Sequence, residues 1–448
     1  MKNYLIDYRV LDEFDIEFLQ KTKILPIVKN ELYITCMICK ESDISSFKDR
    51  YKVAIKTIDL NQEKILFELQ NITIKQELFI LSKLLIEGFT QQTIKDFIYK
   101  IVIFAVSKKS SDIHIEEMSE IITIKFRIDG VLIEFFRFDK EISSAISSVL
   151  KLFSNLDITQ KRLPQNGRFS IELLQEVDFR ISFMPTINGE SIVIRVLEKN
   201  FDRFELEKIG FSSQVLEIIR KNIHLSQGLI LVTGPTGSGK TTTLYSILKE
   251  LKGLNKKIIT AEDPIEYKID NITQISVNNE IGLSYHEILK NILRQDPDIL
   301  LIGEIRDYEA LKSAITASMT GHLVFATLHT NDAISTIFRL LDLEGEHFLI
   351  ATVLKCVIAQ RLLRKRCECM NIKGCIKCNY TGYSGRIVVS EVLQIDKTIE
   401  ELISNRANHI QIQAQALEKG FITMFDDGMQ KVKSNITTKE ELLLVLQK

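Results

Sequence analysis

The sequence lacks any apolar run long enough to cross a lipid bilayer. A membrane-spanning helix needs about 18 to 20 predominantly apolar residues, and no segment of the 448-residue chain approaches that length. The segment from Met1 to Val10 carries Asp7 and lacks the basic-then-apolar order of a secretory signal. These two absences predict a cytoplasmic protein.

The chain also lacks a net charge of either sign. Its 58 basic and 59 acidic side chains nearly cancel, so no overall field would draw it onto nucleic acid or an anionic membrane. Direct binding of nucleic acid is therefore not expected. Internal repeats and low-complexity segments are absent as well. The proportions of 45% hydrophobic and 26% charged residues are typical of a folded globular protein, and the length allows roughly two to four domains.

Disulfides are not expected, because cytoplasmic thiols stay reduced. The seven cysteines are interpreted instead as core residues or metal ligands. Cys36 and Cys39 lie in an apolar, strand-like run without obvious ligand partners, and we predict that both are buried thiols.

Four further cysteines form a cluster near the C-terminus, namely Cys367, Cys369, Cys375 and Cys378. Four thiolates are the ligand set of a closed, tetrahedral structural zinc site, with reduced surface thiols or an iron–sulfur cluster as the alternatives. The first pair has the spacing C-x-C, where C-x-x-C is usual, and the intervening loop is short. Four basic side chains are expected to stabilise the thiolates: Arg361, Arg364, Lys365 and Arg366.

Local patterns predict a multidomain α/β protein. Helices are expected over 11–23, 74–86 and 94–106, and Asp129-Gly130 predicts a hairpin between strands 121–128 and 131–138. From residue 229 onward, short apolar runs alternate with helical patterns, as in a parallel sheet covered on both faces. Beyond about residue 350 the chain looks mostly helical apart from the cysteine cluster. The predicted domains span 1–88, 89–205, 206–360, 361–390 and 391–448.

A glycine-rich motif carries the strongest chemical signal. It follows the apolar run 229–233, opens a helical stretch and fits the eight-position phosphate-loop pattern; its residues are Gly234, Pro235, Thr236, Gly237, Ser238, Gly239, Lys240 and Thr241. Glycines let backbone amides converge on phosphate oxygens, and the helix N-terminus adds a favourable dipole. Lys240 would contact the β and γ phosphates, Thr241 would bind magnesium, and Thr242 completes the nucleotide-binding set. The alternative is a strand-to-helix turn that binds nothing.

Two acidic residues follow neighbouring apolar strands. Glu262 ends the run 258–261, and Glu304 follows the run 299–302 in a segment similar to a Walker B strand. Gly303 stands where the magnesium-binding aspartate of that motif usually lies, so Glu304 would hold magnesium through water. Ligands collect at the carboxyl ends of parallel strands, and Glu262 could there orient and deprotonate the attacking water. The alternative for each is a carboxylate that caps the following helix.

Histidines bracket the next apolar strand, 323–328. His329 lies at the carboxyl end, where a sensor of the γ-phosphate is plausible, whereas His322 lies at the opposite end. A lone histidine is more often a polar residue with ordinary hydrogen bonds, and this alternative stays open for both.

Eight blocks between residues 111 and 391 resemble, in the same order, the type II secretion and type IV pilus assembly ATPases. They are Ser111–Glu116, Phe126–Leu132, Arg162–Arg168, the glycine-rich motif, Glu262–Tyr267, Leu293–Asp298, Gly303–Asp307 and the segment Thr320–Asp332. The segment Thr381–Arg386 is similar to the zinc-bearing region of this family.

The resemblance implies a homo-hexamer of RecA-like domains that uses ATP and Mg²⁺, with an α+β domain before the core, a small four-cysteine zinc insert and a helical C-terminus. It also implies that Arg180 and Arg195 reach the nucleotide phosphates, a role that suits the permanently charged guanidinium. Glu262 is then favoured as the base and Glu304 as the magnesium organiser, although the reverse is possible. Residues 1–88 would act as an adaptor that docks on an inner-membrane partner, and the motor would drive a platform protein in that membrane.

Three alternatives remain. A nucleic-acid translocase conflicts with the near-neutral charge and with the lack of a basic aromatic stretch. A scaffold that binds nucleotide without hydrolysis is suggested by the missing Walker B aspartate. A pilus-retraction ATPase is disfavoured by the cysteine cluster, which retraction members of the family typically lack.

Overall fold

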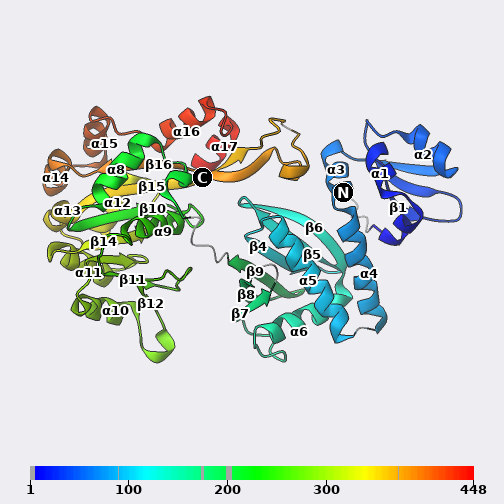
Figure 1. Ribbon diagram of the computed structural model, residues 1–448, viewed down its shortest axis with the longest axis horizontal. Coiled ribbons are helices and arrows are strands. Elements are labelled where there is room, and N and C mark those ends of the chain that lie inside the picture. Colours follow the sequence, from blue (N-terminus) through cyan, green and yellow to red (C-terminus); the bar gives the residue numbers. More distant parts are fainter. Residues whose placement is uncertain (1–5, 89, 173–175, 198–203, 372, 448) are drawn as a thin grey trace. The chain divides into compact units, whose positions relative to one another are not determined.

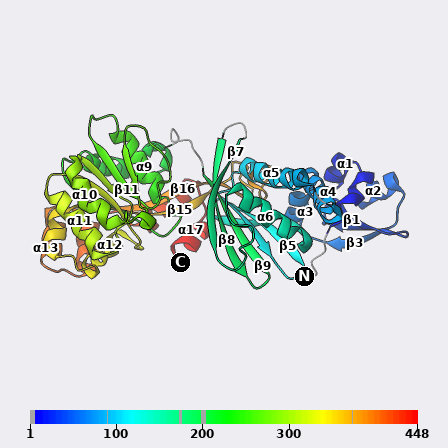
Figure 2. The same ribbon diagram turned by 90° about the horizontal axis from the view of Figure 1, so that it is seen from below.

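The computed structural model describes residues 6–88, 90–172, 176–197, 204–371 and 373–447 (Figures 1 and 2). These residues form two compact units. Unit 1 comprises residues 1–199 and 367–384, and unit 2 comprises residues 200–366 and 385–448. The chain therefore passes between the units after residues 199, 366 and 384. The finer division into five domains stays a prediction.

Unit 1 begins with a three-stranded sheet in the order β1-β2-β3 and its flanking helices. Its elements are η1 (Tyr8–Glu13), α1 (Ile16–Thr22), β1 (Leu25–Lys29), β2 (Ile34–Ile38), α2 (Ile44–Tyr51), β3 (Ile55–Asp59) and α3 (Gln62–Gln70). The expectation of a single helix over 11–23 is correct for residues 16–22 only. Asp15 is extended, and its carboxylate accepts hydrogen bonds from the N–H groups of Glu17 and Phe18, so that a new helix begins there.

Cys36 and Cys39 confirm the prediction of buried thiols. Their exposed fractions are 0% and 5%, and both belong to the hydrophobic core of this first sheet. Burial raises the pKa of Cys36 to about 12.

The rest of unit 1 contains a six-stranded sheet in the order β6-β5-β4-β9-β8-β7. Its elements are α4 (Ile72–Gly88), α5 (Gln91–Ser107), β4 (Asp112–Glu117), β5 (Ile121–Ile128), β6 (Val131–Asp139), η2 (Lys140–Ile142), α6 (Ser143–Phe153), β7 (Gln165–Glu172), β8 (Glu176–Thr186), β9 (Gly189–Leu197) and, after the cysteine cluster begins, η6 (Ile376–Cys378). The predicted hairpin is confirmed, because β5 and β6 pair on either side of Asp129 and Gly130. Both turn residues have positive φ angles, 51° and 85°, as such a tight turn requires.

Unit 2 contains a seven-stranded sheet in the order β12-β11-β13-β14-β10-β15-β16. All pairings from β12 to β15 are parallel. The elements up to β14 are α7 (Leu206–Ile209), α8 (Ser213–Ile223), β10 (Gly228–Thr233), α9 (Lys240–Leu251), β11 (Ile258–Glu262), β12 (Thr273–Ser276), η4 (Asn279–Ile281), α10 (Tyr285–Ile292), η5 (Leu293–Gln295), β13 (Ile299–Ile302), α11 (Tyr308–Met319) and β14 (Leu323–Leu328).

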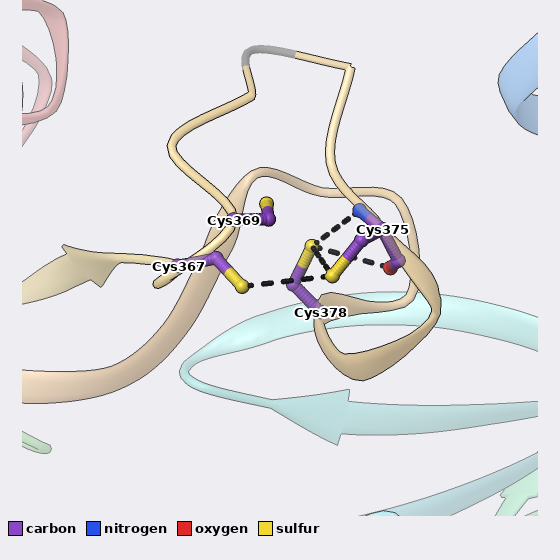
Figure 3. Close-up of side chains that lie close together, drawn as sticks. All are labelled: Cys367, Cys369, Cys375 and Cys378. Atoms are coloured by element: carbon purple, nitrogen blue, oxygen red, sulfur yellow. Dashed lines mark hydrogen bonds between the residues drawn. The ribbon is translucent and has the colours of Figure 1, made fainter.

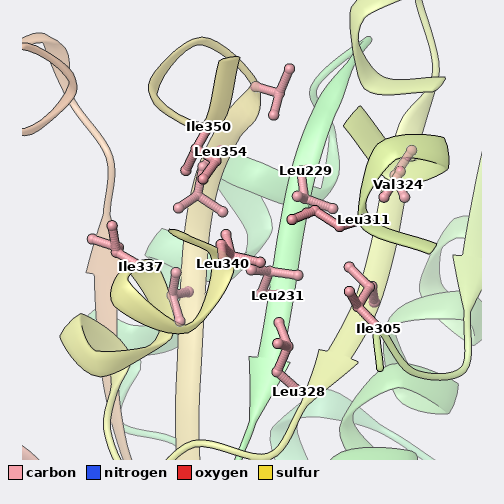
Figure 4. Packing of buried hydrophobic residues seen from close by; sticks show 14 of the residues in the cluster. Leu229, Leu231, Ile305, Leu311, Val324, Leu328, Ile337, Leu340, Ile350 and Leu354 are labelled. Carbon is pink, nitrogen blue, oxygen red and sulfur yellow. The ribbon is translucent and has the colours of Figure 1, made fainter. Parts of the chain in front are cut away.

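Alternate residues of the central strand β10 enter different hydrophobic cores. Leu229 and Leu231 pack with residues of α11, α12 and α13 (Figure 4), whereas Ile230 and Val232 pack with residues of α8 and α9. Helices thus cover both faces of the sheet, as the continuous apolar runs predict.

The expectation of a mostly helical region beyond residue 350 is wrong in part. After α12 (Ala333–Asp342) and α13 (His347–Val353), the long strands β15 (Leu354–Arg366) and β16 (Tyr383–Gln394) extend the sheet, and only then follow α14 (Lys397–Ser404), α15 (His409–Glu418), α16 (Met424–Lys433) and α17 (Lys439–Leu446). The apolar residues of β15 are buried on both faces of the sheet, so they show no strand-like alternation that a sequence could reveal.

Among the described residues, no helix combines the length and the apolar character that crossing a bilayer would require.

A buried ion pair in unit 1 leads to a test of stability. Lys151 Nζ lies 2.7 Å from Glu190 Oε1, and both side chains are almost fully buried. We expect Lys151→Met to lower the free energy of unfolding by about 3–5 kcal/mol, because it leaves a buried carboxylate without its cation. Lys100→Met is the matched control, since Lys100 pairs with Glu77 on the surface and its loss should cost about 0–1 kcal/mol. Urea denaturation followed by circular dichroism measures both, and equal losses would contradict the prediction.

Candidate active site

The glycine-rich motif forms the loop between β10 and α9. Residues 234–239 connect the last residue of β10, Thr233, to the first residue of α9, Lys240. Gly234 and Gly239 have φ angles of 146° and 90°, where other residues are strained. A Cβ atom at Gly234 would also lie 2.4 Å from the carbonyl oxygen of Gln360, whereas one at Gly237 would meet no atom within 4 Å. The loop is thus packed against β15 at its start and open to a ligand in its middle.

Gln360 supports the loop from β15, and the sequence analysis did not identify it as a site residue. Its side chain is fully buried. Its Nε2 donates to the carbonyl oxygen of Ser238 at 2.8 Å, and its Oε1 accepts from Thr243 Oγ1 at 2.8 Å. This position becomes recognisable only when β15 is known to pair with β10, a register that places Ala359 beside Thr233.

The side chain of Lys240 folds back onto the loop that precedes it. Its Nζ donates hydrogen bonds to the carbonyl oxygens of Gly234, at 2.7 Å, and Pro235, at 3.2 Å. Burial, together with the positive charge of Arg361, lowers the pKa of Lys240 to about 8. A bound phosphate would raise that pKa again, because an adjacent anion favours the charged ammonium.

The loop fits a nucleotide phosphate chain with magnesium. Ser238 Oγ is buried and has no hydrogen-bond partner among the described residues, so a hydroxyl donor is available inside the cradle. The side chains of Thr241 and Thr242 are exposed at the first turn of α9. Thr241 would therefore be the residue to hold the metal, while the loop amides and Lys240 would hold the phosphates.

Glu262 lies at the end of β11, and the residue is only 5% exposed. Oε2 accepts a hydrogen bond from Tyr245 Oη at 2.5 Å. Oε1 accepts from Thr260 Oγ1 at 2.6 Å and from Gln274 Nε2 at 3.3 Å. Three donors therefore fix this carboxylate, and none of them belongs to the residues that the sequence singled out.

Glu304 lies just beyond β13, and its side chain is 21% exposed. It forms an ion pair with Arg306, and its Oε2 lies 3.5 Å from His329 Nε2. Glu304 and His329, which the sequence analysis considered separately, thus contact each other at one edge of the sheet. Burial, followed by repulsion from Lys240 and Arg306, lowers the pKa of His329, which favours the neutral imidazole.

His322 lies at the other end of β14. Its Nδ1 is 2.9 Å from the carbonyl oxygen of Ala317 and 3.1 Å from Thr320 Oγ1. These contacts place it at the C-terminal end of α11, away from His329, where it satisfies a helix carbonyl.

The glycine that replaces the Walker B aspartate has a steric explanation. A Cβ atom at Gly303 would lie 2.4 Å from Tyr285 Oη. That hydroxyl donates to the carbonyl oxygen of Ala261 at 2.7 Å and accepts from the N–H of Glu304 at 3.3 Å. Tyr285 thus occupies the space of the missing side chain and joins β11 to the segment that carries Glu304.

Arg180 and Arg195 lie in unit 1, side by side on β8 and β9. The same cross-strand row continues to Arg168 on β7, and through Asp112 on β4 to Arg127 on β5. Asp112 pairs with Arg195 Nε at 3.1 Å and with Arg127 Nε at 3.6 Å. The row therefore concentrates positive charge on one face of the six-stranded sheet. The roles predicted for Arg180 and Arg195 stay predictions.

The four clustered cysteines fit a tetrahedral zinc site. Their Sγ atoms all lie within 4.8 Å of one another, and Cys375 Sγ lies 3.8 Å from Cys367 Sγ and 3.9 Å from Cys378 Sγ (Figure 3). Zinc–sulfur bonds of about 2.3 Å in a tetrahedron require sulfur separations of about 3.8 Å. The short C-x-C spacing therefore does not prevent the four sulfurs from converging.

The arginines before the cluster bond to other residues and not to the cysteine thiols that they were expected to stabilise. Arg361 Nη2 donates to Asn331 Oδ1 at 3.1 Å, Arg364 pairs with Glu441 at 2.5 Å, and Arg366 Nη1 donates to Asn435 Oδ1 at 3.3 Å. All three belong to β15 and to unit 2, whereas the cysteines belong to unit 1. The expectation is therefore wrong for these three arginines, whose side chains bond to other residues of unit 2, and it stays a prediction for Lys365.

Comparison with known proteins gives one family. The family described as "Type II/IV secretion system protein" matches residues 88–444. The type II secretion system protein HxcR of Pseudomonas aeruginosa is 42% identical over 350 residues, which are 76% of this chain and 75% of that protein. The type IV pilus assembly ATPase PilB of Myxococcus xanthus is 40% identical over 373 residues, which are 77% of this chain and 66% of that protein. The chain thus spans just under two thirds of that relative's length.

Solved structures show the same fold. The pilus retraction motor PilT with bound ADP is 30% identical with a TM-score of 0.55, and the match covers 77% of this chain and 95% of that one. The ATPase DotB of Legionella pneumophila has a TM-score of 0.62 at 21% identity, covering 78% and 94%, a likeness of fold alone. The predicted α/β fold with a RecA-like parallel-sheet core is confirmed.

Gly303→Ala tests the steric role of Tyr285. The added methyl group should overlap with the Tyr285 hydroxyl and lower the free energy of unfolding by about 1–3 kcal/mol. Thermal denaturation measures the loss. The double variant Gly303→Ala/Tyr285→Phe should recover part of it, and a double variant no more stable than Gly303→Ala would contradict the explanation.

Cys375→Ser tests the zinc site. Loss of one of four ligands should release the metal, so that zinc measured by mass spectrometry falls from about one ion per chain to near zero. The segment 367–384 should become sensitive to protease, while nucleotide binding persists. Cys36→Ala, which alters a buried core thiol, is the control and should retain zinc. A stable wild-type protein without zinc would contradict the assignment.

Proposed function

Since the chain belongs to the Type II/IV secretion system protein family, we propose that it is an ATPase that drives assembly of a type II secretion or type IV pilus machine. One observation carries the proposal. The phosphate-binding loop after β10 lies at the same sheet edge as Glu262, Glu304 and His329, which follow β11, β13 and β14. This is the edge at which ligands of parallel sheets bind.

The proposed reaction is attack of water on the γ-phosphorus of ATP. The bond to the β,γ-bridging oxygen breaks, ADP and phosphate leave, and the proton of the water passes to a carboxylate. Lys240 and the loop amides hold the phosphates, and magnesium, if held by Thr241, would offset the negative charge of the phosphates. His329, neutral and 3.5 Å from Glu304, can report the γ-phosphate through a hydrogen bond.

The sequence favoured Glu262 as the base and Glu304 as the magnesium organiser. The order of the strands and the hydrogen bonds of Glu262 better support the opposite assignment. In the sheet, β13 lies nearer than β11 to β10, which brings Glu304 about one strand spacing, roughly 4.8 Å, closer to the loop. Glu262 already accepts three hydrogen bonds, which suits a fixed carboxylate that orders metal-bound water. We therefore assign Glu304 as the base and Glu262 as the magnesium organiser.

Arg180 and Arg195 are proposed to bind the phosphates as the nucleotide is enclosed. Two neighbouring guanidinium groups on one sheet face repel each other, and a phosphate chain would offset that repulsion. Arg180→Ala and Arg195→Ala should each lower turnover more than nucleotide binding to the loop.

The proposed working form is a cytoplasmic homo-hexamer. By family likeness, it would act on an inner-membrane platform protein and dock through residues 1–88 on the cytoplasmic domain of another assembly protein. Direct contact with nucleic acid is not part of the proposal, given the net charge of −1.

A retraction motor is the second candidate, favoured by the likeness to PilT and disfavoured by the cysteine cluster. Deleting the gene and scoring secretion, piliation, retraction and DNA uptake separates these machines.

Lys240→Ala tests the motor itself. The variant removes the cation that contacts the phosphates, so we expect release of inorganic phosphate to fall by more than about a hundredfold. Purified full-length protein with Mg²⁺ and ATP provides the measurement, and circular dichroism should show an unchanged fold. Wild-type protein that binds ATP but releases no phosphate would instead support a non-catalytic scaffold, and stimulation by single-stranded DNA would support a translocase.

A further inference from the structure

We propose that Tyr245 is a positioning residue for ATP hydrolysis, which fixes the Glu262 carboxylate through its phenol hydroxyl. The inference rests on the proposed function, because Glu262 matters in this way only if the chain hydrolyses ATP. Tyr245 lies on α9, the helix that begins with Lys240, and its Oη donates to Glu262 Oε2 at 2.5 Å. A side chain of the nucleotide-binding helix thus contacts a carboxylate on β11 directly.

The surroundings of Tyr245 fix its hydroxyl, which also accepts a hydrogen bond from the N–H of Tyr267 at 3.4 Å. The side chain is 1% exposed, and its ring packs against the rings of Phe204 and Tyr267, with centroids 5.8 and 5.6 Å away. Burial, and then the charge of Glu262, raise the pKa of Tyr245 far above its usual value, so the phenol stays a neutral donor. A hydrogen bond from a buried donor to a carboxylate is stronger than one between neutral groups.

The second oxygen of Glu262 is held independently. Oε1 accepts from Thr260 Oγ1 at 2.6 Å, two residues earlier on the same strand, and from Gln274 Nε2 at 3.3 Å, on β12. Gln274 is itself fixed, because its Nε2 also donates to the carbonyl oxygen of Tyr267 at 2.9 Å and its Oε1 accepts from the N–H of Ile269 at 2.7 Å. With one donor on Oε2 and two on Oε1, the plane of the carboxylate is determined.

This arrangement connects the residue that would bind the phosphates to a carboxylate that would take part in hydrolysis. Lys240 and Tyr245 share one helix, and Tyr245 connects that helix to Glu262. Displacement of a catalytic group by about 1 Å can cost about a hundredfold in rate. Removal of the hydroxyl should therefore affect turnover and leave nucleotide affinity largely intact, since the hydroxyl faces β11.

Tyr245→Phe is the primary test, because it keeps the ring and its packing. In full-length protein, kcat should fall by about tenfold to a hundredfold, the range for loss of a hydrogen bond to a charged group. The KM for ATP at saturating magnesium and the affinity for ADP without magnesium should stay within about twofold. The magnesium concentration for half-maximal activity should rise, which a purely structural role would not produce. Tyr33→Phe, on the connection between β1 and β2 in unit 1, is the matched control and should leave all four quantities unchanged.

A double-mutant cycle tests whether Tyr245 acts on turnover through Glu262. If Tyr245 acts through that carboxylate, Tyr245→Phe should have little further effect in a Glu262→Gln background, whereas losses that simply multiply would overturn the inference. Thr260→Val removes a donor from the other oxygen and should reproduce the loss of kcat and the raised magnesium requirement. An unchanged kcat in Tyr245→Phe, with an active wild type, would overturn this inference alone. A wild type without turnover would overturn the proposed function, and this inference with it.

Discussion

The parallel alignment of the strands in unit 2 is the constraint on which the site depends. Because β11, β13, β14, β10 and β15 all run in one direction, their carboxyl ends meet at one edge of the sheet. The glycine-rich loop, two carboxylates and a histidine thereby converge although they are far apart in the sequence. The two hydrophobic cores on either face of the sheet hold that alignment in place.

Around this edge, a second layer of side chains decides how each functional group is oriented. Gln360 supports the loop, Tyr245 fixes Glu262, and Tyr285 joins β11 to the segment of Glu304. These three residues are uncharged, and each forms hydrogen bonds with two segments of the chain. The charged side chains of the candidate site are therefore held in place by neutral neighbours.

The sequence was enough to predict the glycine-rich loop, the acidic residues and the cysteines, but not the buried residues that hold them in place. The loop 234–241, Glu262, Glu304 and the four cysteines were identified because their residue types and local order are characteristic. Gln360, Tyr245 and Tyr285 were missed because ordinary residue types acquire these positions only through strand pairing and helix packing over long sequence separations. Strand β15 was mistaken for part of a helical region for a related reason, since a strand buried on both faces lacks the period-two pattern.

The cysteine segment is the connection between β15 and β16, which are neighbours in the sheet. Strand β15 supports the loop through Gln360 and then enters the segment at Cys367. A metal bound by both Cys367 and Cys378 would cross-link the start of this connection to a point near its end, and the cross-link would restrict fraying of the two strands. Zinc would then help to keep the shape of the glycine-rich loop from a distance, without touching a nucleotide.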